Sequence, residues 1–160
     1  MDNKKSIWKY IVLAIYILLV GSFFFFSLRT SEKSVKESTI ATDAVEVIGE
    51  AVTFKQVEFD YDTLYYLTRK MIGHYGYNAL MGLFCFLVIY MFKKRGNFAL
   101  AISLIIGVVI AIAGELLQFI PEGRVPDSLD AVFNILGEVT GLLFIYIIIL
   151  LKERKTPKND

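Results

Sequence analysis

Four apolar runs, each long enough to cross a lipid bilayer, decide what kind of fold this chain can adopt. A helix that rises about 1.5 Å per residue crosses about 30 Å of hydrocarbon in roughly 20 residues. The runs cover residues 11–28, 71–92, 98–119 and 128–151. With 56% hydrophobic residues and a mean hydropathy of +0.56, the chain is too apolar for a soluble domain of 160 residues. We therefore expect an all-α membrane protein with four transmembrane helices in a single domain, residues 1–160.

The basic residues predict how these helices are oriented. They lie before the first run, between the second and third, and after the fourth: Lys4, Lys5, Lys9, Lys93, Lys94, Arg95, Lys152, Arg154, Lys155 and Lys158. Lys and Arg are enriched in cytoplasmic segments. Residues 29–70 carry six basic and eight acidic residues, a net charge of −2. We expect both termini in the cytoplasm, an extracytoplasmic loop at residues 30–70, and a multi-pass protein of the cell membrane.

The first run is expected to be a permanent anchor. A basic start followed by an apolar run also occurs in signal peptides, but this run is long, Phe23 to Phe26 are bulky, and no small-x-small site follows. Arg29 at its outer edge either extends to the surface or points inward to the polar residues described below. The single Cys85 excludes an intramolecular disulfide and is expected to pack inside the second helix.

The 30–70 loop contains two segments with helical periodicity. Apolar residues recur near helical spacing from Lys33 to Val52, and a second amphipathic helix is expected from Asp60 to Arg69, where tyrosines offer aromatic area to the membrane interface. We expect these helices to form a cap over the outer face. A solvated linker with transient helix is the alternative.

A polar stretch, residues 114–141, joins the third and fourth runs. In hydrocarbon, polar residues are costly and normally face a protein interior, a partner or a water-filled cavity. The stretch contains Glu115, Gln118, Glu122, Arg124, Asp127, Asp130, Asn134 and Glu138. It is therefore the candidate site.

Spacing predicts that two polar helix faces meet there. At about 100° per residue, Asp127, Asp130 and Asn134 share one face of the fourth helix, and Glu115 and Gln118 share one face of the third. A short turn makes these helices antiparallel neighbours, so Glu115 should lie opposite Asn134 and Gln118 opposite Asp130. The alternative is a purely structural contact, in which Asp127 caps the fourth helix.

The second run contributes Lys70, His74 and Asn78, which are four residues apart and so share a helical face. His74 either joins the site or hydrogen-bonds a backbone carbonyl at the interface. Arg124 either binds Asp127 or a carboxylate or phosphate on a ligand. The predicted ligand-binding residues are Lys70, His74, Glu115, Gln118, Arg124, Asp127, Asp130 and Asn134.

Other kinds of site are not indicated. Glu138 is expected to be neutral or hydrogen-bonded within the bundle, and Gly137-x-x-x-Gly141 to be a close-packing seam. No HExxH or Cys/His spacing predicts a metal, and no nucleophile-elbow pattern supports Ser128 and His74 as a catalytic pair. No cofactor is expected, and no basic face indicates nucleic acid.

The motif as a whole resembles the VanZ-like family of small bacterial membrane proteins. The similar residues are Glu115-x-x-Gln118-Phe119, then Arg124-x-x-Asp127-x-x-Asp130-x-x-x-Asn134-x-x-Gly137-x-x-x-Gly141, with upstream Lys70-x-x-x-His74-Tyr75 and Gly82. The resemblance covers roughly residues 69–145. It implies an envelope protein whose founding relative is linked to resistance to teicoplanin, a glycopeptide that binds cell-wall precursors.

Two function classes follow from the residues and the resemblance. The first is a non-enzymatic protein whose outer pocket binds an envelope lipid headgroup, a lipid-linked cell-wall precursor or a glycopeptide, and so lowers antibiotic action. The second is an intramembrane hydrolase or transferase acting on a lipid-linked phosphate or sugar, with His74, Glu115 or Asp130 as acid or base. Transport is a weaker third class, because four helices leave little room for a pathway. The sequence does not specify an oligomeric state.

Overall fold

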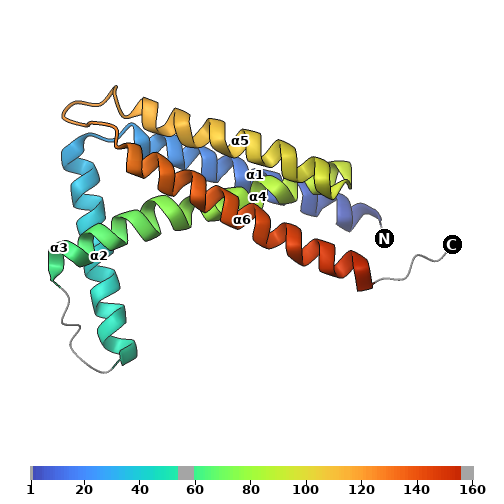
Figure 1. Ribbon diagram of the computed structural model, residues 1–160, viewed down its shortest axis with the longest axis horizontal. Coiled ribbons are helices and arrows are strands. Elements are labelled where there is room, and N and C mark those ends of the chain that lie inside the picture. Colours follow the sequence, from blue (N-terminus) through green and yellow to red (C-terminus); the bar gives the residue numbers. More distant parts are fainter. Residues whose placement is uncertain (1, 54–59, 156–160) are drawn as a thin grey trace.

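The computed structural model describes residues 2–53 and 60–155, and almost all of them are helical (Figure 1). The segments are α1 (Asp2–Ser27), α2 (Ser31–Thr53), α3 (Tyr61–Leu67), the π-helical η1 (Thr68–Gly76), α4 (Tyr77–Lys93), α5 (Gly96–Leu117) and α6 (Ser128–Lys155). The described residues contain no strand. Four helical stretches are long and apolar enough to cross a membrane: Ile7–Ser27, Tyr61–Lys93, Gly96–Leu117 and Ser128–Arg154. The predicted all-α fold with four such helices is confirmed.

The second membrane helix begins earlier than the hydropathy of the sequence predicts. It runs without interruption through α3, η1 and α4, and starts at Tyr61 rather than at residue 71. Asp60 caps it, since its carboxylate accepts from the backbone N–H of Thr63. Lys70 and His74 therefore lie inside a continuous helix. The predicted loop is mostly helix, α2 and α3, while residues 54–59 and the basic Lys158 lie outside the described residues.

Small residues bring α4, α5 and α6 together into the core of the bundle. A Cβ atom on Gly137 would overlap the carbonyl of Tyr75, and one on Gly141 would overlap the carbonyl of Ala79. The backbones of α6 and of the η1–α4 helix are therefore in direct contact, as the seam at Gly137-x-x-x-Gly141 predicts.

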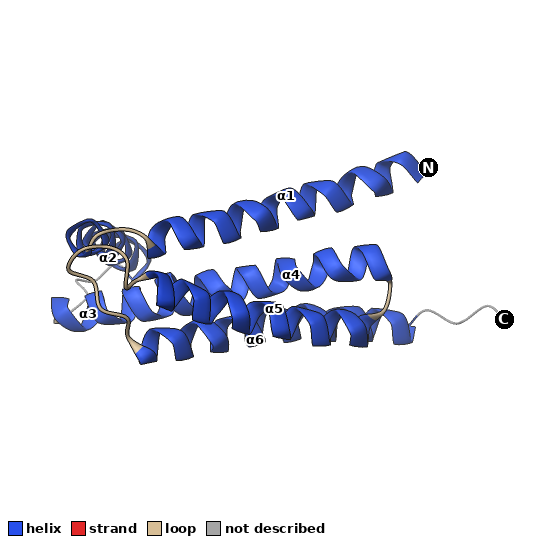
Figure 2. Ribbon diagram, turned by 90° about the horizontal axis from the view of Figure 1, so that it is seen from above, coloured by secondary structure: helices blue, strands red, loops and turns tan. Residues whose placement is uncertain are grey.

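The first helix packs beside this core, against α4 and α5 (Figure 2). The ring of Phe23 occupies the space that a side chain on Gly114 would need. The hydroxyl of Tyr77 donates to the carbonyl of Leu19 at 2.9 Å and lies 2.5 Å from the hydroxyl of Ser22. α1 is thus attached by a packed ring and by polar contacts from α4.

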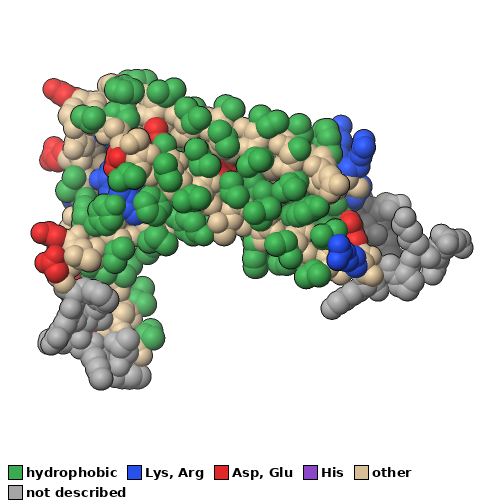
Figure 3. All heavy atoms as spheres, viewed as in Figure 1, with side chains coloured by type: hydrophobic (Ala, Val, Ile, Leu, Met, Phe, Trp, Pro, Cys, Tyr) green, Lys and Arg blue, Asp and Glu red, His purple; other side chains and the backbone are tan. Residues whose placement is uncertain are grey.

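The two ends of the bundle differ. At one end, which we call the capped end, α2 runs across the bundle axis and the α5–α6 connection turns at Gly123, whose φ of 71° suits glycine (Figure 1). At the other, the basic end, lie Lys93, Lys94 and Arg95 (Figure 3). An apolar cluster of Phe86, Ala99 and Leu142 fills the half of the bundle toward the basic end. The polar residues of the site lie in the half toward the capped end.

Candidate functional site

The nine-residue π-helix η1 carries three basic residues of the site, Arg69, Lys70 and His74. A π-helix has i→i+5 hydrogen bonds and more residues per turn than the 3.6 of an α-helix. Side chains four residues apart therefore lie more nearly above one another, and Lys70, His74 and Asn78 all turn toward α6. This local geometry was not predicted, although Gly73 and Gly76 within one short segment indicate a weakened α-helix.

Lys70 holds two carboxylates at the start of α6. Its ammonium lies 2.8 Å from Asp127 Oδ2 and also contacts Asp130 Oδ1. The side chains of Lys70 and Asp130 are 6% and 2% exposed, whereas that of Asp127 is 44% exposed. Asp127 also caps α6, because its Oδ1 accepts from the backbone N–H of Leu129 at 2.9 Å. Asp127 therefore both caps α6 and binds the ammonium of Lys70.

His74 lies one turn further into the bundle, between Asp130 and Asn134. Its Nε2 is 3.2 Å from Asp130 Oδ2, and its Nδ1 is 3.1 Å from Asn134 Oδ1. That amide oxygen also accepts from Asn78 Nδ2 at 2.8 Å, so it serves as an acceptor and Nδ1 of His74 donates. Both ring nitrogens of His74 are thus occupied by protein partners.

The network continues through α5. Asn134 Nδ2 donates to Glu115 Oε1 at 2.8 Å, and Gln118 Nε2 donates to Glu115 Oε2 at 2.8 Å. Arg124 Nε then donates to Gln118 Oε1 at 3.0 Å. Glu115 and Asn134 face each other, as the spacing predicts. Gln118 bonds Glu115 and Arg124, whereas the spacing places it opposite Asp130.

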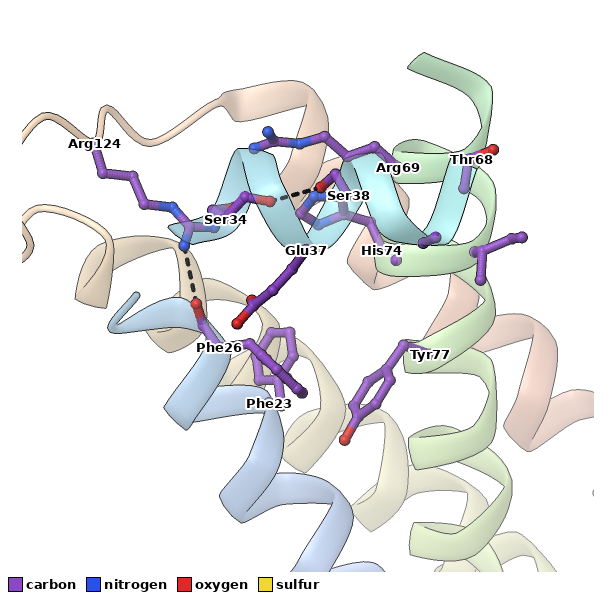
Figure 4. Close-up of a pocket in the computed structure, with 13 residues that line it drawn as sticks. Phe23, Phe26, Ser34, Glu37, Ser38, Thr68, Arg69, His74, Tyr77 and Arg124 are labelled. Carbon is purple, nitrogen blue, oxygen red and sulfur yellow. Dashed lines mark hydrogen bonds between the residues drawn. The ribbon is translucent and has the colours of Figure 1, made fainter. Parts of the chain in front are cut away.

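Arg124 has partners that the sequence analysis missed. Its Nη1 donates to the carbonyl of Phe26 at 2.9 Å and lies 3.3 Å from that of Arg29 (Figure 4). It has no bond to Asp127, which pairs with Lys70 instead. Arg29 is turned away from the polar stretch: its side chain is 31% exposed, and its guanidinium pairs with Glu37 of α2 at 2.9 Å.

All eight predicted site residues thus belong to one hydrogen-bonded network. It is continuous from Asp127 and Lys70 through Asp130, His74, Asn134, Glu115 and Gln118 to Arg124. Asn78 and Arg69 also join it, the latter with Nη2 at 3.8 Å from Asp130 Oδ2. Asn78 lies on the predicted polar face of the second helix, and Arg69 is adjacent to Lys70. Their positions in the sequence could therefore have indicated that Asn78 and Arg69 belong to the network.

A cavity of about 240 Å³ lies beside the network, between α1, α2 and the second membrane helix. Its polar lining includes Arg69, His74 and Arg124, with Ser34, Glu37 and Ser38 from α2. Rings of Phe23, Phe26 and Tyr77 line the other side (Figure 4). An outer pocket was predicted, but with a different lining: of its eight predicted residues, His74 and Arg124 line this cavity and the other six do not. The contribution of α1 and α2, which supply about half of the described wall, was not predicted.

This arrangement shifts the pKa values of two groups outside the membrane spans, Arg124 and Asp127. Burial lowers the pKa of the Arg124 guanidinium from its ordinary value, and the positive charge of Arg69 lowers it further. The hydrogen bond from Lys70, followed by that from the Leu129 N–H, holds the pKa of Asp127 below its usual range. Arg69 and Arg124 line the same cavity, so their positive charges act on each other. Asp127 is ionised at neutral pH.

Glu138 stands apart from the network. It is 1% exposed, and neither of its oxygens has a hydrogen-bond partner in the described part of the chain. Its Oε2 lies 2.7 Å and 2.8 Å from the positions that Cβ atoms on Gly82 and Gly107 would take. The described residues contain no group of three or more His, Cys, Asp or Glu residues that could hold a metal ion.

Comparison of the chain with protein-family models assigns its family. The family model described as VanZ/LLP1 matches residues 10–150. The chain belongs to the VanZ/LLP1 family. No curated protein and no solved structure matches this VanZ/LLP1 chain. The family match spans all four membrane helices and the whole network, so the resemblance drawn from the motif is confirmed.

Proposed function

We propose that this VanZ/LLP1 protein binds the anionic headgroup of an envelope lipid in the cavity, without converting it, and that the capped end faces the outside of the cell. The observation that carries the proposal is the presence of two guanidinium groups, Arg69 and Arg124, in a cavity whose other side is aromatic. Guanidinium groups suit phosphate, which they bind in bidentate fashion. An amphiphile with a phosphate head and an apolar chain matches both walls.

Charge balance supports an anionic ligand. Among the described residues that line the cavity, Glu37 is the one carboxylate, and Arg29 already pairs with it. Arg69 shares Asp130 with Lys70 and His74 and lies furthest from it, with Nη2 at 3.8 Å from Asp130 Oδ2, so its charge is only partly balanced within the described residues. A phosphate between Arg69 and Arg124 relieves their mutual repulsion and gains charge-assisted hydrogen bonds.

Cavity size indicates how much of the ligand is enclosed. Pockets that enclose a drug-sized molecule have volumes of about 300–1,000 Å³. At about 240 Å³, the cavity holds a headgroup and the start of a chain. The remaining chain lies outside the protein, in the surrounding lipid.

The role of the predicted site residues is then to position Arg124 and the wall of the cavity. Arg124 is held by Gln118, Gln118 by Glu115, and Glu115 by Asn134. Because each polar group is occupied by the next, the guanidinium is fixed before the ligand arrives. Such preorganisation lowers the entropic cost of binding.

An enzyme of the hydrolase or transferase class is the alternative. It needs an acid or base directed at the ligand. Both nitrogens of His74 and both oxygens of Glu115 are bonded within the network, and Asp130 contacts Lys70, His74 and Arg69. Of the three, His74 alone is among the described residues that line the cavity, and both of its ring nitrogens are bonded within the network, which favours binding over catalysis.

Lipid binding in nanodiscs tests the proposal. The wild-type protein is reconstituted with phosphatidylcholine alone or with added phosphatidylglycerol or a polyprenyl phosphate, and retained lipid is measured by native mass spectrometry. We expect retention of the anionic lipids, reduced about tenfold or more by Arg69→Gln or Arg124→Gln. Lys36→Gln, an exposed charge outside the cavity, is the matched control. Equal retention by all variants contradicts the proposal, and release of free phosphate or sugar favours the enzyme.

Binding of an envelope headgroup also gives a route to glycopeptide resistance. A lipid-linked precursor held by the protein is withheld from an antibiotic that acts outside the membrane. We expect expression of the wild-type chain to raise the inhibitory concentration of teicoplanin, and Arg69→Gln to abolish the increase at equal protein level.

A further inference from the structure

The second half of α2 carries an apolar face that neither the bundle nor the cavity uses. Ile40, Val47, Ile48 and Val52 are between 60% and 72% exposed. At about 100° per residue they occupy an arc of about 140°. Glu46, which lies between them in the sequence, points to the opposite side of the helix. α2 is therefore amphipathic along its projecting half.

The direction of α2 relative to the bundle indicates what covers this face. The four membrane helices lie along the long axis of the molecule, whereas α2 runs across it (Figure 1) and is seen nearly end-on in the second view (Figure 2). A bilayer crossed by the four helices is perpendicular to that axis. α2 therefore runs along the surface of the leaflet at the capped end, and its second half projects beyond the bundle.

The hydrophobic side chains of this projecting half lie on the membrane side. In Figure 3 they lie along the edge that faces along the bundle toward the basic end. That is the direction of the hydrocarbon in which α4, α5 and α6 lie. An amphipathic helix in this position buries its apolar face at the boundary between headgroups and acyl chains.

We propose that the face formed by Ile40, Val47, Ile48 and Val52 is a lipid-binding surface, inserted into the leaflet at the capped end. The charge of α2 indicates how it binds. Its 23 residues contain two basic and five acidic residues, a net charge of −3. Attraction to anionic lipid does not contribute, so apolar burial drives the insertion.

This surface extends the proposed function to the wall of the cavity. The first half of the same helix contributes Ser34, Glu37, Ser38 and Ala41 to the lining. Within the protein α2 is attached by the pair Arg29–Glu37 and by the hydrogen bond from the Tyr61 hydroxyl to Asp43 at 2.7 Å. The lipid surface supplies a further attachment and thereby fixes the position of α2 in the wall of the cavity.

Depth-dependent fluorescence quenching tests the insertion. Trp8, the single tryptophan, is replaced by Phe, and one new tryptophan is introduced as Ile48→Trp or, as the matched control on the opposite side of α2, as Glu46→Trp. The full-length proteins are reconstituted in phosphatidylcholine vesicles containing lipids brominated near the glycerol end of the chain. We expect at least threefold stronger quenching for Ile48→Trp than for Glu46→Trp, unchanged by added phosphatidylglycerol or by 0.5 M salt.

Two outcomes overturn the proposal. Equally weak bromine quenching of both variants, with strong quenching by aqueous iodide, means that α2 lies in water. Protection of Ile48→Trp from bromine and iodide alike, with a doubled molecular mass, means that a second copy of the chain covers the face. Because the readout needs no headgroup ligand, adding Arg69→Gln leaves it unchanged, and failure of the cavity proposal is distinguished from failure of this one.

Discussion

Two carboxyl groups on α6, Asp130 and Glu138, are equally buried but have opposite surroundings. Each residue is 1% exposed. Asp130 faces Lys70 and His74, whereas neither oxygen of Glu138 has a partner among the described residues. An unpaired charge in an apolar interior is far more costly than a neutral acid. Asp130 therefore acts as a fixed negative charge, and Glu138 packs as a neutral group between Gly82 and Gly107.

This contrast predicts that two isosteric substitutions reduce stability by very different amounts. Asp130→Asn leaves the buried ammonium of Lys70 with one carboxylate, the half-exposed Asp127, and should cost about 3–5 kcal/mol of stability. Glu138→Gln changes no ion pair and should cost less than about 1 kcal/mol. Unfolding of both variants in the same detergent, followed by circular dichroism, checks the ranking. Equal losses would show that Asp130 is not held by charge.

Asp127 should make the free energy of unfolding depend on pH, with stability lost as the pH falls. Its pKa lies below the usual range because Lys70 and then the Leu129 N–H hydrogen-bond the ionised form. A group with a lowered folded pKa stabilises the fold above its unfolded pKa and loses that contribution as the pH falls through the folded value. With the side chain 44% exposed, the contribution is under about 1 kcal/mol.

The corresponding measurement compares wild type with Asp127→Asn, which retains a capping oxygen. The difference in melting temperature should be constant from about pH 5 to 8 and should shrink as the pH falls below the ordinary range of an aspartate carboxyl group. A difference that grows on acidification would contradict the pairing with Lys70.

At the scale of helices, close approach of backbones holds the bundle together. Three glycines differ in what a Cβ atom at their position would meet. A Cβ on Gly141 meets the backbone carbonyl of Ala79, and one on Gly114 meets the ring of Phe23. A Cβ on Gly21 has nothing within 4 Å. A ring can rotate out of the way, whereas a packed helix backbone must move as a whole.

The same substitution to alanine should therefore give three different results. Gly114→Ala should cost about 1–3 kcal/mol through overpacking, and Gly141→Ala should cost more. Gly21→Ala should be neutral or stabilise by up to about 1 kcal/mol, because alanine favours helix. Adding Phe23→Ala should recover part of the loss at Gly114 and none at Gly141, as a double-mutant cycle on unfolding measures. Recovery at both positions would mean that α1, and not the α4–α6 contact, limits stability.

Prediction from sequence succeeded at this scale where neighbours in space are also neighbours in the chain. The membrane helices follow from apolar runs of sufficient length, and the contact of Glu115 with Asn134 follows from a short turn between antiparallel helices. The partners of Arg124 did not follow, because the carbonyls of Phe26 and Arg29 are nearly a hundred residues away in the chain. The cavity depends on the same distant contacts. The π-helical geometry of η1 was missed because hydrophobic periodicity does not distinguish it from an α-helix over nine residues.

At the scale of the whole molecule, the polar and apolar halves of the bundle are segregated along its axis. The network and the cavity lie toward the capped end, and the cluster around Phe86 and Leu142 lies toward the basic end. A polar cavity toward one end and an apolar cluster toward the other suit a site reached from one side of the membrane. They argue against a pathway through the bundle.

The distribution of basic residues predicts which side that is. Lys93, Lys94 and Arg95 at the basic end should remain in the cytoplasm, because Lys and Arg in short connections oppose translocation. Single cysteines at two exposed positions, Glu122→Cys near the capped end and Arg95→Cys at the basic end, report the orientation. In intact cells a membrane-impermeant maleimide should label Glu122→Cys at once and Arg95→Cys after permeabilisation only. The native Cys85 is buried and should stay unlabelled in both, which serves as the control. Labelling of Arg95→Cys alone in intact cells would place the cavity on the cytoplasmic side, and an outer-leaflet ligand would then be excluded whatever its headgroup.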